Sequence, residues 1–179
     1  MRSESEESLK GYVQVFTGNG KGKTTASLGL ALRAVGAGFN AFIGQFTKGS
    51  DYSELNSIQM LSDQITLKQF GQKGFIRNKP DQNDINQALA GLKQIQSIIA
   101  TAQYQMVILD EVNIAIYYQL FTVDHLIDVL DLRHPSLEVI LTGRYADPKI
   151  IEYADLVTEM KEIKHYFKSG IKARVGIEK

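Results

Sequence analysis

The chain has 179 residues, and its 20 Lys and Arg balance 20 Asp and Glu, so the formal net charge is zero. This length is typical of one domain, and the neutral charge argues against a polybasic nucleic-acid binder. Hydrophobic residues make up 44% of the chain and charged residues 22%, which indicates a buried core and excludes disordered and fibrous classes. The absence of Cys excludes a disulfide framework and thiolate chemistry, and it favours a reducing compartment.

The first ten residues are rich in Ser and Glu and lack the apolar run of a secretory signal. No window reaches the ~18 consecutive apolar residues that a membrane span requires. We therefore expect a cytoplasmic protein that binds neither a membrane nor nucleic acid. Residues 1–10 are expected to form a flexible N-terminal segment, and residues 11–179 a single domain.

From residue 11 onward, short β-branched or aromatic runs alternate with longer segments of helical period. This alternation is typical of an α/β fold with a parallel sheet covered on both faces. The expected strands are residues 12–17, 41–46, 65–70, 106–110, 138–142 and 156–160. The expected helices are residues 24–37, 54–61, 85–101, 123–132 and 148–153.

The helix expected at residues 85–101 has a clear start signal and one apolar stripe. Asp81 or Asn83 can cap it with a side-chain oxygen, and Pro80 prevents an earlier continuous start. The stripe is expected to face the core rather than a ligand. It consists of Ala88, Leu89, Leu92, Ile95 and Ile99.

The first expected strand runs into a glycine-rich turn and then into an Ala/Leu-rich helix, which is the context of a Walker A loop. The residues concerned are Gly18, Asn19, Gly20, Lys21, Gly22, Lys23, Thr24 and Thr25. Glycines let backbone amides surround phosphate oxygens, and the helix start adds free amides and a positive dipole end. Lys23 is expected to reach phosphate oxygens, and the Thr24 hydroxyl to bind Mg²⁺.

This loop is one residue shorter than the usual G-x-x-x-x-G-K-[ST] pattern, counted from Gly18. A surface turn rich in Gly and Lys is the alternative interpretation, and Lys21 could be a solvated charge.

Asp110 and Glu111 follow a buried apolar strand, so they are expected at the carboxyl edge of the sheet, where open α/β folds bind ligands. Either carboxylate could hold Mg²⁺ or its water, and we assign both to a metal site together with Thr24. The alternative is that the acidic pair caps a helix.

Three further positions are ligand candidates. Arg144 follows a strand end and could clamp phosphate oxygens, although a surface salt bridge explains it nearly as well. Gln45 and Lys48 could face the ligand crevice, or they could be solvated loop residues.

Several strings in the chain together resemble the ATP:corrinoid adenosyltransferases of the CobA/BtuR type. These strings are Phe16-Thr-Gly-Asn-Gly-Lys-Gly-Lys-Thr-Thr25, Arg33-Ala-Val-Gly36, Gln45-Phe-x-Lys-Gly49, Leu109-Asp-Glu111, Thr142-Gly-Arg144, Lys164-His-x-Phe167 and Gly170-x-Lys-Ala173-x-x-Gly176-Ile177. The resemblance runs from about residue 11 to residue 177. It implies a P-loop NTPase-like (RecA-like), mostly parallel sheet with helices on both faces.

The resemblance also implies a reaction and its participants. A corrinoid reduced to Co(I) attacks the 5′ carbon of ATP and triphosphate leaves, so no protein base is required. Mg²⁺ accompanies ATP, a reductase supplies the electron, and a homodimer is expected. By the resemblance, residues 18–25, Arg33 and Arg144 bind the nucleotide. Lys23 and Glu111 are the catalytic residues.

For the corrinoid, the resemblance implies contacts from Phe75, Gln45 and Lys48. Enterobacterial members carry Gly-Phe-x-Trp in the loop that displaces the lower cobalt ligand, whereas this chain reads Gly74-Phe75-Ile76-Arg77 and contains no Trp. Family members also often have a longer N-terminal segment that covers the partner's site in a dimer, and fewer residues precede the first strand here.

Two other function classes remain open from the residues alone. One is a small P-loop kinase or ATPase, which would normally add an arginine-bearing lid. The other is a nucleotide-dependent binding module in which residues 71–80 and 161–172 contact a protein partner. His165 has no carboxylate or second histidine at ligand spacing, so we assign it no catalytic role.

Overall fold

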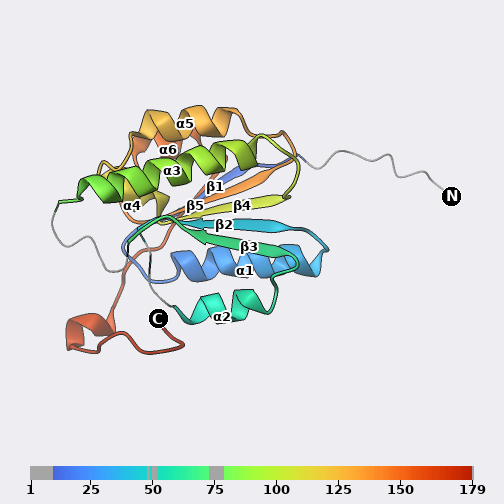
Figure 1. The fold of residues 1–179 in the computed structure, drawn as a ribbon. Coiled ribbons are helices and arrows are strands. Elements are labelled where there is room, and N and C mark those ends of the chain that lie inside the picture. Colours follow the sequence, from blue (N-terminus) through green and yellow to red (C-terminus); the bar gives the residue numbers. More distant parts are fainter. Residues whose placement is uncertain (1–9, 48, 50–51, 73–78, 179) are drawn as a thin grey trace.

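The computed structural model describes residues 10–47, 49, 52–72 and 79–178 (Figure 1). Within these residues, six parallel strands form one sheet in the order β3-β2-β4-β5-β1-β6. Their bounds are β1 Val13–Thr17, β2 Ala41–Gln45, β3 Ile65–Gln69, β4 Met106–Asp110, β5 Glu138–Thr142 and β6 Leu156–Glu159. This confirms the α/β class, and each expected strand ends within one residue of its predicted bounds.

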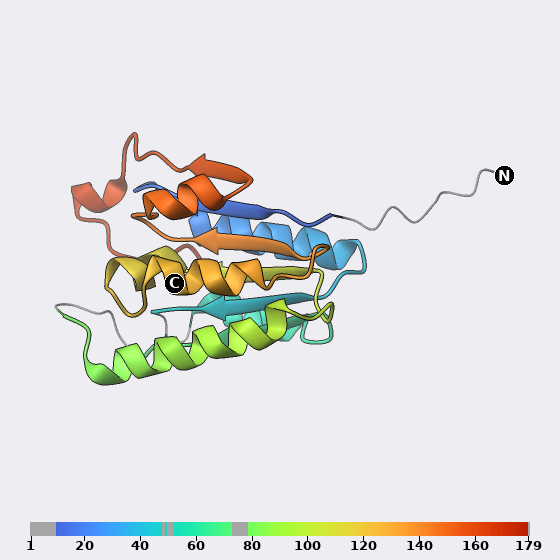
Figure 2. The same cartoon turned by 90° about the horizontal axis from the view of Figure 1, so that it is seen from above.

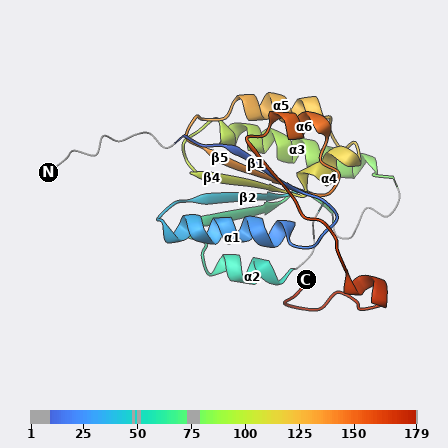
Figure 3. The same ribbon diagram turned by 180° about the vertical axis from the view of Figure 1, so that it is seen from behind.

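The helices cover both faces of the sheet (Figures 1 and 3). On one face lie α1 Lys23–Gly36 and α2 Ser53–Gln59. On the other lie α3 Gln82–Ile99, α4 Val112–Tyr117, α5 Val123–Asp131 and α6 Pro148–Tyr153, with α3 and α5 side by side in the view from above (Figure 2).

The strand order explains this division. The connections from β1 to β2 and from β2 to β3 run toward one edge of the sheet, whereas those after β3, β4 and β5 run toward the other. Because crossovers between parallel strands are right-handed, reversing the direction moves the helices to the opposite face. The loops after β1 and after β4 therefore diverge at the carboxyl edge, which opens a crevice between them.

Alternate residues of the strands supply two apolar cores, because successive side chains point to opposite faces. On β1, Val13 and Val15 pack with α3, α5 and α6, while Phe16 packs with α1. The central strands β2, β4 and β5 are apolar on both faces, and the observed register brings the polar carboxyl ends of the strands to one edge.

Helix α3 begins at Gln82, three residues earlier than expected, and Asp81 caps it in a reciprocal capping box with Asp84. Asp81 was one of the two predicted caps. Ala88, Leu92, Ile95 and Ile99 are buried as predicted. Leu89 is not part of this core stripe, because its side chain is 40% exposed.

Two short elements were not expected. Helix α4 has only six residues and begins one residue after β4, so its short apolar run gives no clear helical period. The separation comes from the backbone of Glu111, which is left-handed with φ 59°. The second element is a 3-10 turn, Tyr166–Ser169, in the C-terminal segment.

Two predictions concern residues largely outside the described ones. They are the flexible segment at residues 1–10, of which only Lys10 is described, and the loop at residues 71–80, of which residues 73–78 are not described. None of the helices within the described residues has the length and apolar content that a bilayer crossing demands.

Candidate active site

The glycine loop between β1 and α1 rests on the end of β6. Gly20 donates its backbone N–H to the Met160 carbonyl at 2.6 Å. A Cβ atom on Gly18 or on Gly20 would lie 2.6 Å from that same carbonyl oxygen. Gly18 and Gly22 also have positive φ values, 91° and 122°. Glycine is therefore required at these positions by the close contact with the residue after β6 and by the positive φ values of the turn.

Lys23 is the first residue of α1, and its side chain curls back into the loop. Its Nζ donates to the carbonyl oxygens of Gly18 at 2.6 Å and Gly20 at 2.8 Å. Burial lowers the pKa of Lys23, with a further lowering from Arg144, while Glu111 and Asp110 raise it. An ammonium has three donors, so a third N–H remains beyond these two bonds to meet an anion. Lys21, by contrast, is exposed.

Asp110 is the hub of a buried hydrogen-bond network at the end of β4. Its Oδ1 accepts the hydroxyls of Thr24 at 2.9 Å and Thr142 at 2.7 Å. Its Oδ2 accepts Gln45 Nε2 at 3.2 Å. Only 1% of Asp110 is exposed. The carboxylate thus joins the start of α1 to the ends of β2 and β5.

Glu111 follows in a left-handed conformation that few residues other than glycine adopt, and such strain is concentrated at functional sites. Its backbone N–H donates to Thr142 Oγ1 at 2.9 Å. Glu111 occupies the N-cap position of α4, but its side chain makes no capping hydrogen bond. This argues against the helix-capping alternative for the acidic pair, and the side chain lines the adjacent cavity instead.

A cavity of about 650 Å³ opens over the loop. The loop and the start of α1 form its floor, and Glu111, Arg144, α2 and the C-terminal segment form its walls. The lining residues are Gly20, Lys21, Gly22, Lys23, Thr24, Thr25, Leu28, Tyr52, Ser53, Glu54, Ser57, Glu111, Arg144, His165, Gly176, Ile177 and Glu178. Six of the eight predicted loop residues, Glu111 and Arg144 are therefore brought together around one space.

Two other loop predictions lie just outside this lining. Gly18 accepts a hydrogen bond from Lys23, and Asn19 is exposed next to it. Both residues are therefore part of the glycine loop, but neither lines the cavity.

Arg33 is not brought to the cavity. It is exposed near the end of α1, ten residues beyond Lys23, which corresponds to roughly 15 Å along the helix axis. Gln45 does not face the crevice either, because its side chain is completely buried. These positions do not agree with two predictions: that Arg33 contacts the nucleotide within this chain, and that Gln45 contacts the corrinoid directly. Lys48, Phe75 and Arg77 lie outside the described residues.

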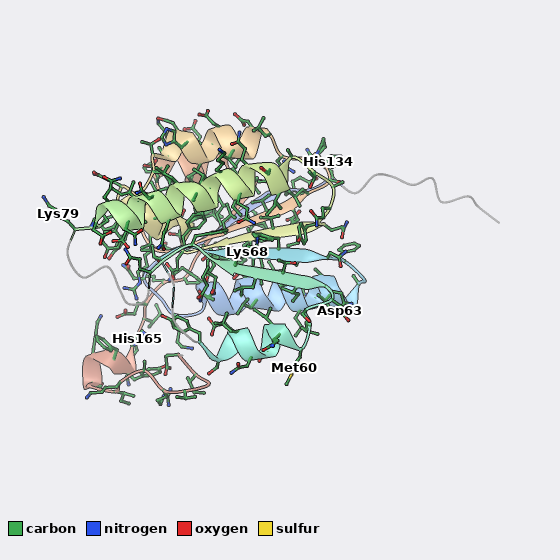
Figure 4. The ribbon with its side chains drawn as sticks, in the orientation of Figure 1. Met60, Asp63, Lys68, Lys79, His134 and His165 are labelled. Carbon is green, nitrogen blue, oxygen red and sulfur yellow. The ribbon has the colours of Figure 1, made fainter. Side chains whose placement is uncertain are left out.

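Sequence reasoning missed Thr142 and His165 as site residues. Leu109 on β4 is paired with Leu141 on β5, so the next residues, Asp110 and Thr142, lie side by side. The order of the strands therefore carried a signal for Thr142. His165 lies on the C-terminal segment (Figure 4) and lines the cavity. Its Nδ1 accepts the Phe167 N–H at 3.1 Å, which leaves Nε2 as the protonated nitrogen of the neutral ring.

The donor set fits Mg²⁺ bound together with a polyphosphate. Among the described residues no cluster of three or more His, Asp or Glu could hold a metal ion alone. Mg²⁺ typically takes one or two protein oxygens and completes its shell with phosphates and water. Because the Thr24 hydroxyl donates its proton to Asp110, its lone pairs remain to bind a cation.

Comparisons with known proteins show the family of the chain. The family model of ATP:corrinoid adenosyltransferase BtuR/CobO/CobP matches residues 9–178. A corrinoid adenosyltransferase of Pseudomonas aeruginosa is 36% identical over 94% of this chain and 84% of its own length. Corrinoid adenosyltransferase CobA of Salmonella typhimurium is 35% identical over 94% of this chain and 86% of its own. The protein belongs to the ATP:corrinoid adenosyltransferase family.

A solved structure supports the fold. The flagellar accessory protein FlaH of Methanocaldococcus jannaschii superposes with a TM-score of 0.59 at 13% identity, over 84% of this chain and 71% of its own. At this identity the likeness concerns the P-loop-like α/β fold alone.

Proposed function

We propose that this protein transfers the 5′-deoxyadenosyl group of ATP to the Co(I) centre of a reduced corrinoid and releases triphosphate. The observation that carries the proposal is the strand, glycine loop and helix with buried Lys23 beside Glu111 and Arg144, in a member of this family. The corrinoid is a substrate, and ATP is the co-substrate.

The reaction is a displacement at carbon. The electron pair of Co(I) forms the cobalt–carbon bond, and the bond between C5′ and the α-phosphate oxygen breaks with its electrons remaining on triphosphate. The protein needs no general base, since no proton is removed. Its contribution is positioning and stabilisation of the charge that develops on the leaving group.

Lys23, the loop amides and the start of α1 are suited to that charge. The ammonium lies where its third N–H meets an anion in the loop, and α1 adds its free amides and positive dipole end. Arg144 adds a second cation on the cavity wall. These groups act most strongly on the departing triphosphate, because its negative charge grows as the C5′–O bond breaks.

Thr24 and Asp110 would hold Mg²⁺ with ATP, Thr24 directly and Asp110 through Thr24 or a bound water, and Glu111 would approach from the cavity side. The bound ion supplies neutralisation of triphosphate charge. The protein keeps the Thr24 hydroxyl pointed at Asp110, so its lone pairs face the nucleotide.

On the corrinoid side we propose Phe75 and Lys48, and we withdraw Gln45 as a direct contact because it is buried. Arg77 occupies the position at which enterobacterial members resembling this chain carry Trp. The family resemblance supports these assignments.

A reductase partner follows from the chemistry, because the nucleophile is cobalt in its Co(I) state. A cytoplasmic location and a homodimer are also proposed. Exposed apolar side chains on β6 and the C-terminal segment support a subunit contact there. These are Leu156, Val157, Ile163, Phe167 and Val175. Light scattering of the purified protein tests the dimer, and a monomer at micromolar concentration would contradict it.

The decisive experiment incubates the protein with Mg²⁺-ATP and chemically reduced Co(I) cobalamin. The expected products are a light-sensitive alkylcobalt species, followed by absorbance, and triphosphate in equal amount. Formation of ADP or orthophosphate without the alkylcobalt product would instead favour the kinase or ATPase alternative. Omitting the corrinoid is the control, and it should leave ATP intact.

A further inference from the structure

Gln69, Gln45 and Asp110 end three neighbouring strands and lie in one row. The register pairs Gln45 with Gln69 across β2 and β3, and with Asp110 across β2 and β4. Gln69 Nε2 donates to Gln45 Oε1 at 3.1 Å, and Gln45 Nε2 donates to Asp110 Oδ2 at 3.2 Å. The three side chains therefore form a hydrogen-bond chain that runs in one direction across the strand ends.

The direction of this chain is set by Asp110. An ionised carboxylate only accepts hydrogen bonds, so the NH₂ group of Gln45 must face Asp110. The amide oxygen of Gln45 then faces Gln69, which must donate. If the Gln45 amide were reversed, its oxygen would face Asp110 Oδ2, so two acceptors would meet. Its NH₂ group would then face the NH₂ group of Gln69. Gln45 is completely buried, so water cannot relieve such a mismatch.

Gln45 also binds the second oxygen of Asp110. Thr24 and Thr142 donate to Oδ1, whereas Gln45 donates to Oδ2. The carboxylate is thus held at both oxygens, and Gln45 contributes to the orientation of its plane. The backbone supports the same arrangement, since Phe46 N–H donates to the Asp110 carbonyl at 2.9 Å.

We infer that Gln45 is a positioning residue for the Mg²⁺-ATP site, and that Gln69 holds the Gln45 amide in its working orientation. Gln45 touches neither ATP nor the cation. It fixes the plane of the Asp110 carboxylate, and Asp110 in turn fixes the hydroxyl of Thr24. This inference rests on the proposed binding of Mg²⁺-ATP, and it does not depend on adenosyl transfer.

The test measures nucleotide binding by calorimetry, with Mg²⁺ and with EDTA. Gln45→Met keeps the length and burial of the side chain and removes the amide. We expect it to weaken ATP binding in Mg²⁺ by about tenfold, the size of one hydrogen bond to a charged group. Binding of ATP in EDTA should change less than about twofold, because loop amides and Lys23 do not depend on Gln45.

Gln14→Met is the matched control. Gln14 is also a strand glutamine whose Nε2 binds a carboxylate, in this case Glu138, far from Asp110. We expect both binding constants of this variant to match those of the unmodified protein. If Gln45→Met does not fold, Gln69→Met carries the same test, with a smaller loss of about threefold in Mg²⁺ alone.

Equal losses in Mg²⁺ and in EDTA would show a general structural role and overturn the inference, as would unchanged binding in both. Manganese bound with ATP gives a second readout, and its electron paramagnetic resonance spectrum should broaden in Gln45→Met but not in Gln14→Met. Absence of an alkylcobalt product from the unmodified protein would overturn the proposed function, while the binding test of Gln45 would still give its own answer.

Discussion

Thr142 donates its hydroxyl to Asp110 Oδ1 at 2.7 Å, across the ends of strands β5 and β4. The same hydroxyl oxygen accepts the backbone N–H of Glu111 at 2.9 Å. One side chain thus orients the buried carboxylate and also holds the left-handed backbone of the next residue. Both members of the acidic pair therefore depend on a residue from a different strand.

Thr142→Val should damage both stability and turnover. Valine has the same shape but neither donor nor acceptor, so the Glu111 N–H loses its partner at a cost of about 1–3 kcal/mol. Adenosyl transfer should fall as Glu111 and Asp110 lose their orientation. Denaturant unfolding and initial rates measure the two effects. Thr142→Ser is the control, because it keeps the hydroxyl, and a serine variant as impaired as the valine one would contradict this role.

Lys23→Ala should lose most activity without losing the fold. The ammonium is directed into the loop that we assign to triphosphate, and removing such a preorganised charge typically lowers kcat by about a hundredfold. The melting temperature should change little, because the relief from burying an ammonium offsets the loss of its two hydrogen bonds to the Gly18 and Gly20 carbonyls. Lys93→Ala, at an exposed position of helix α3 outside the cavity lining, is the control. An unaltered rate of Lys23→Ala at saturating ATP would contradict the assignment.

The lowered pKa of Lys23 predicts a specific pH dependence of ATP affinity. Burial makes the folded pKa lower than the unfolded one, whereas bound triphosphate favours the charged form and raises it again. Affinity should be constant at pH values below the pKa of Lys23 in the free protein, where the ammonium is charged with or without ATP. It should then fall, by up to about tenfold per pH unit, once the pH exceeds the pKa in the free protein. Calorimetry from neutral to alkaline pH checks this.

Lys23→Arg provides the comparison for the pH profile. The guanidinium stays charged throughout this range, so the alkaline fall due to residue 23 should vanish. A variant profile that still follows the one of the unmodified protein would assign the titration to another group.

Gly20→Ala should destabilise the loop. Its Cβ would lie 2.6 Å from the Met160 carbonyl oxygen, a backbone atom that cannot rotate away. We expect a loss of roughly 1–3 kcal/mol in the free energy of unfolding, with weaker ATP binding. Gly29→Ala is the matched control, because nothing lies within 4 Å of its Cβ and it is in helix α1. That change should stabilise the protein by about 0.5–1 kcal/mol.

Arg144→Ala and Arg33→Ala should differ in their effect on ATP. Arg144 lines the cavity, so its loss should raise the KM for ATP about tenfold. Arg33 is exposed far along α1, so its loss should leave the KM within about twofold. Steady-state kinetics with varied ATP measure both. Equal losses would mean that Arg33 reaches a nucleotide, for example in a partner subunit.

The sequence predicted the strands well because both faces of the sheet are apolar and each strand ends at a polar residue, as Asp110 ends β4. It predicted the glycine loop because Gly, Lys and Thr carry the chemistry locally. It could not predict that the close approach of Met160 requires glycine at positions 18 and 20, because Met160 lies 142 and 140 positions further along the chain.

The direction in which a side chain points was the second feature that the sequence could not predict. Gln45 follows the same strand pattern as a crevice residue, and its burial is decided by neighbours on β3 and β4. The prediction for Leu89 was wrong in a similar way, because this residue follows the apolar spacing of α3 and its side chain is nevertheless 40% exposed. His165 was assigned no role because no carboxylate or second histidine lies at ligand spacing in the sequence, and its place on the cavity wall depends on how the C-terminal segment folds.

The link between Gly20 and Met160 has a practical consequence for handling the protein. The chain leaves β6 directly at the loop and then returns with His165, Gly176 and Glu178 to form a wall of the cavity. An affinity tag appended after residue 178 would sit at the mouth of that cavity and compete with nucleotide for space. Lys10 precedes the amino end of β1, whereas the glycine loop follows its carboxyl end, so purification handles belong before β1.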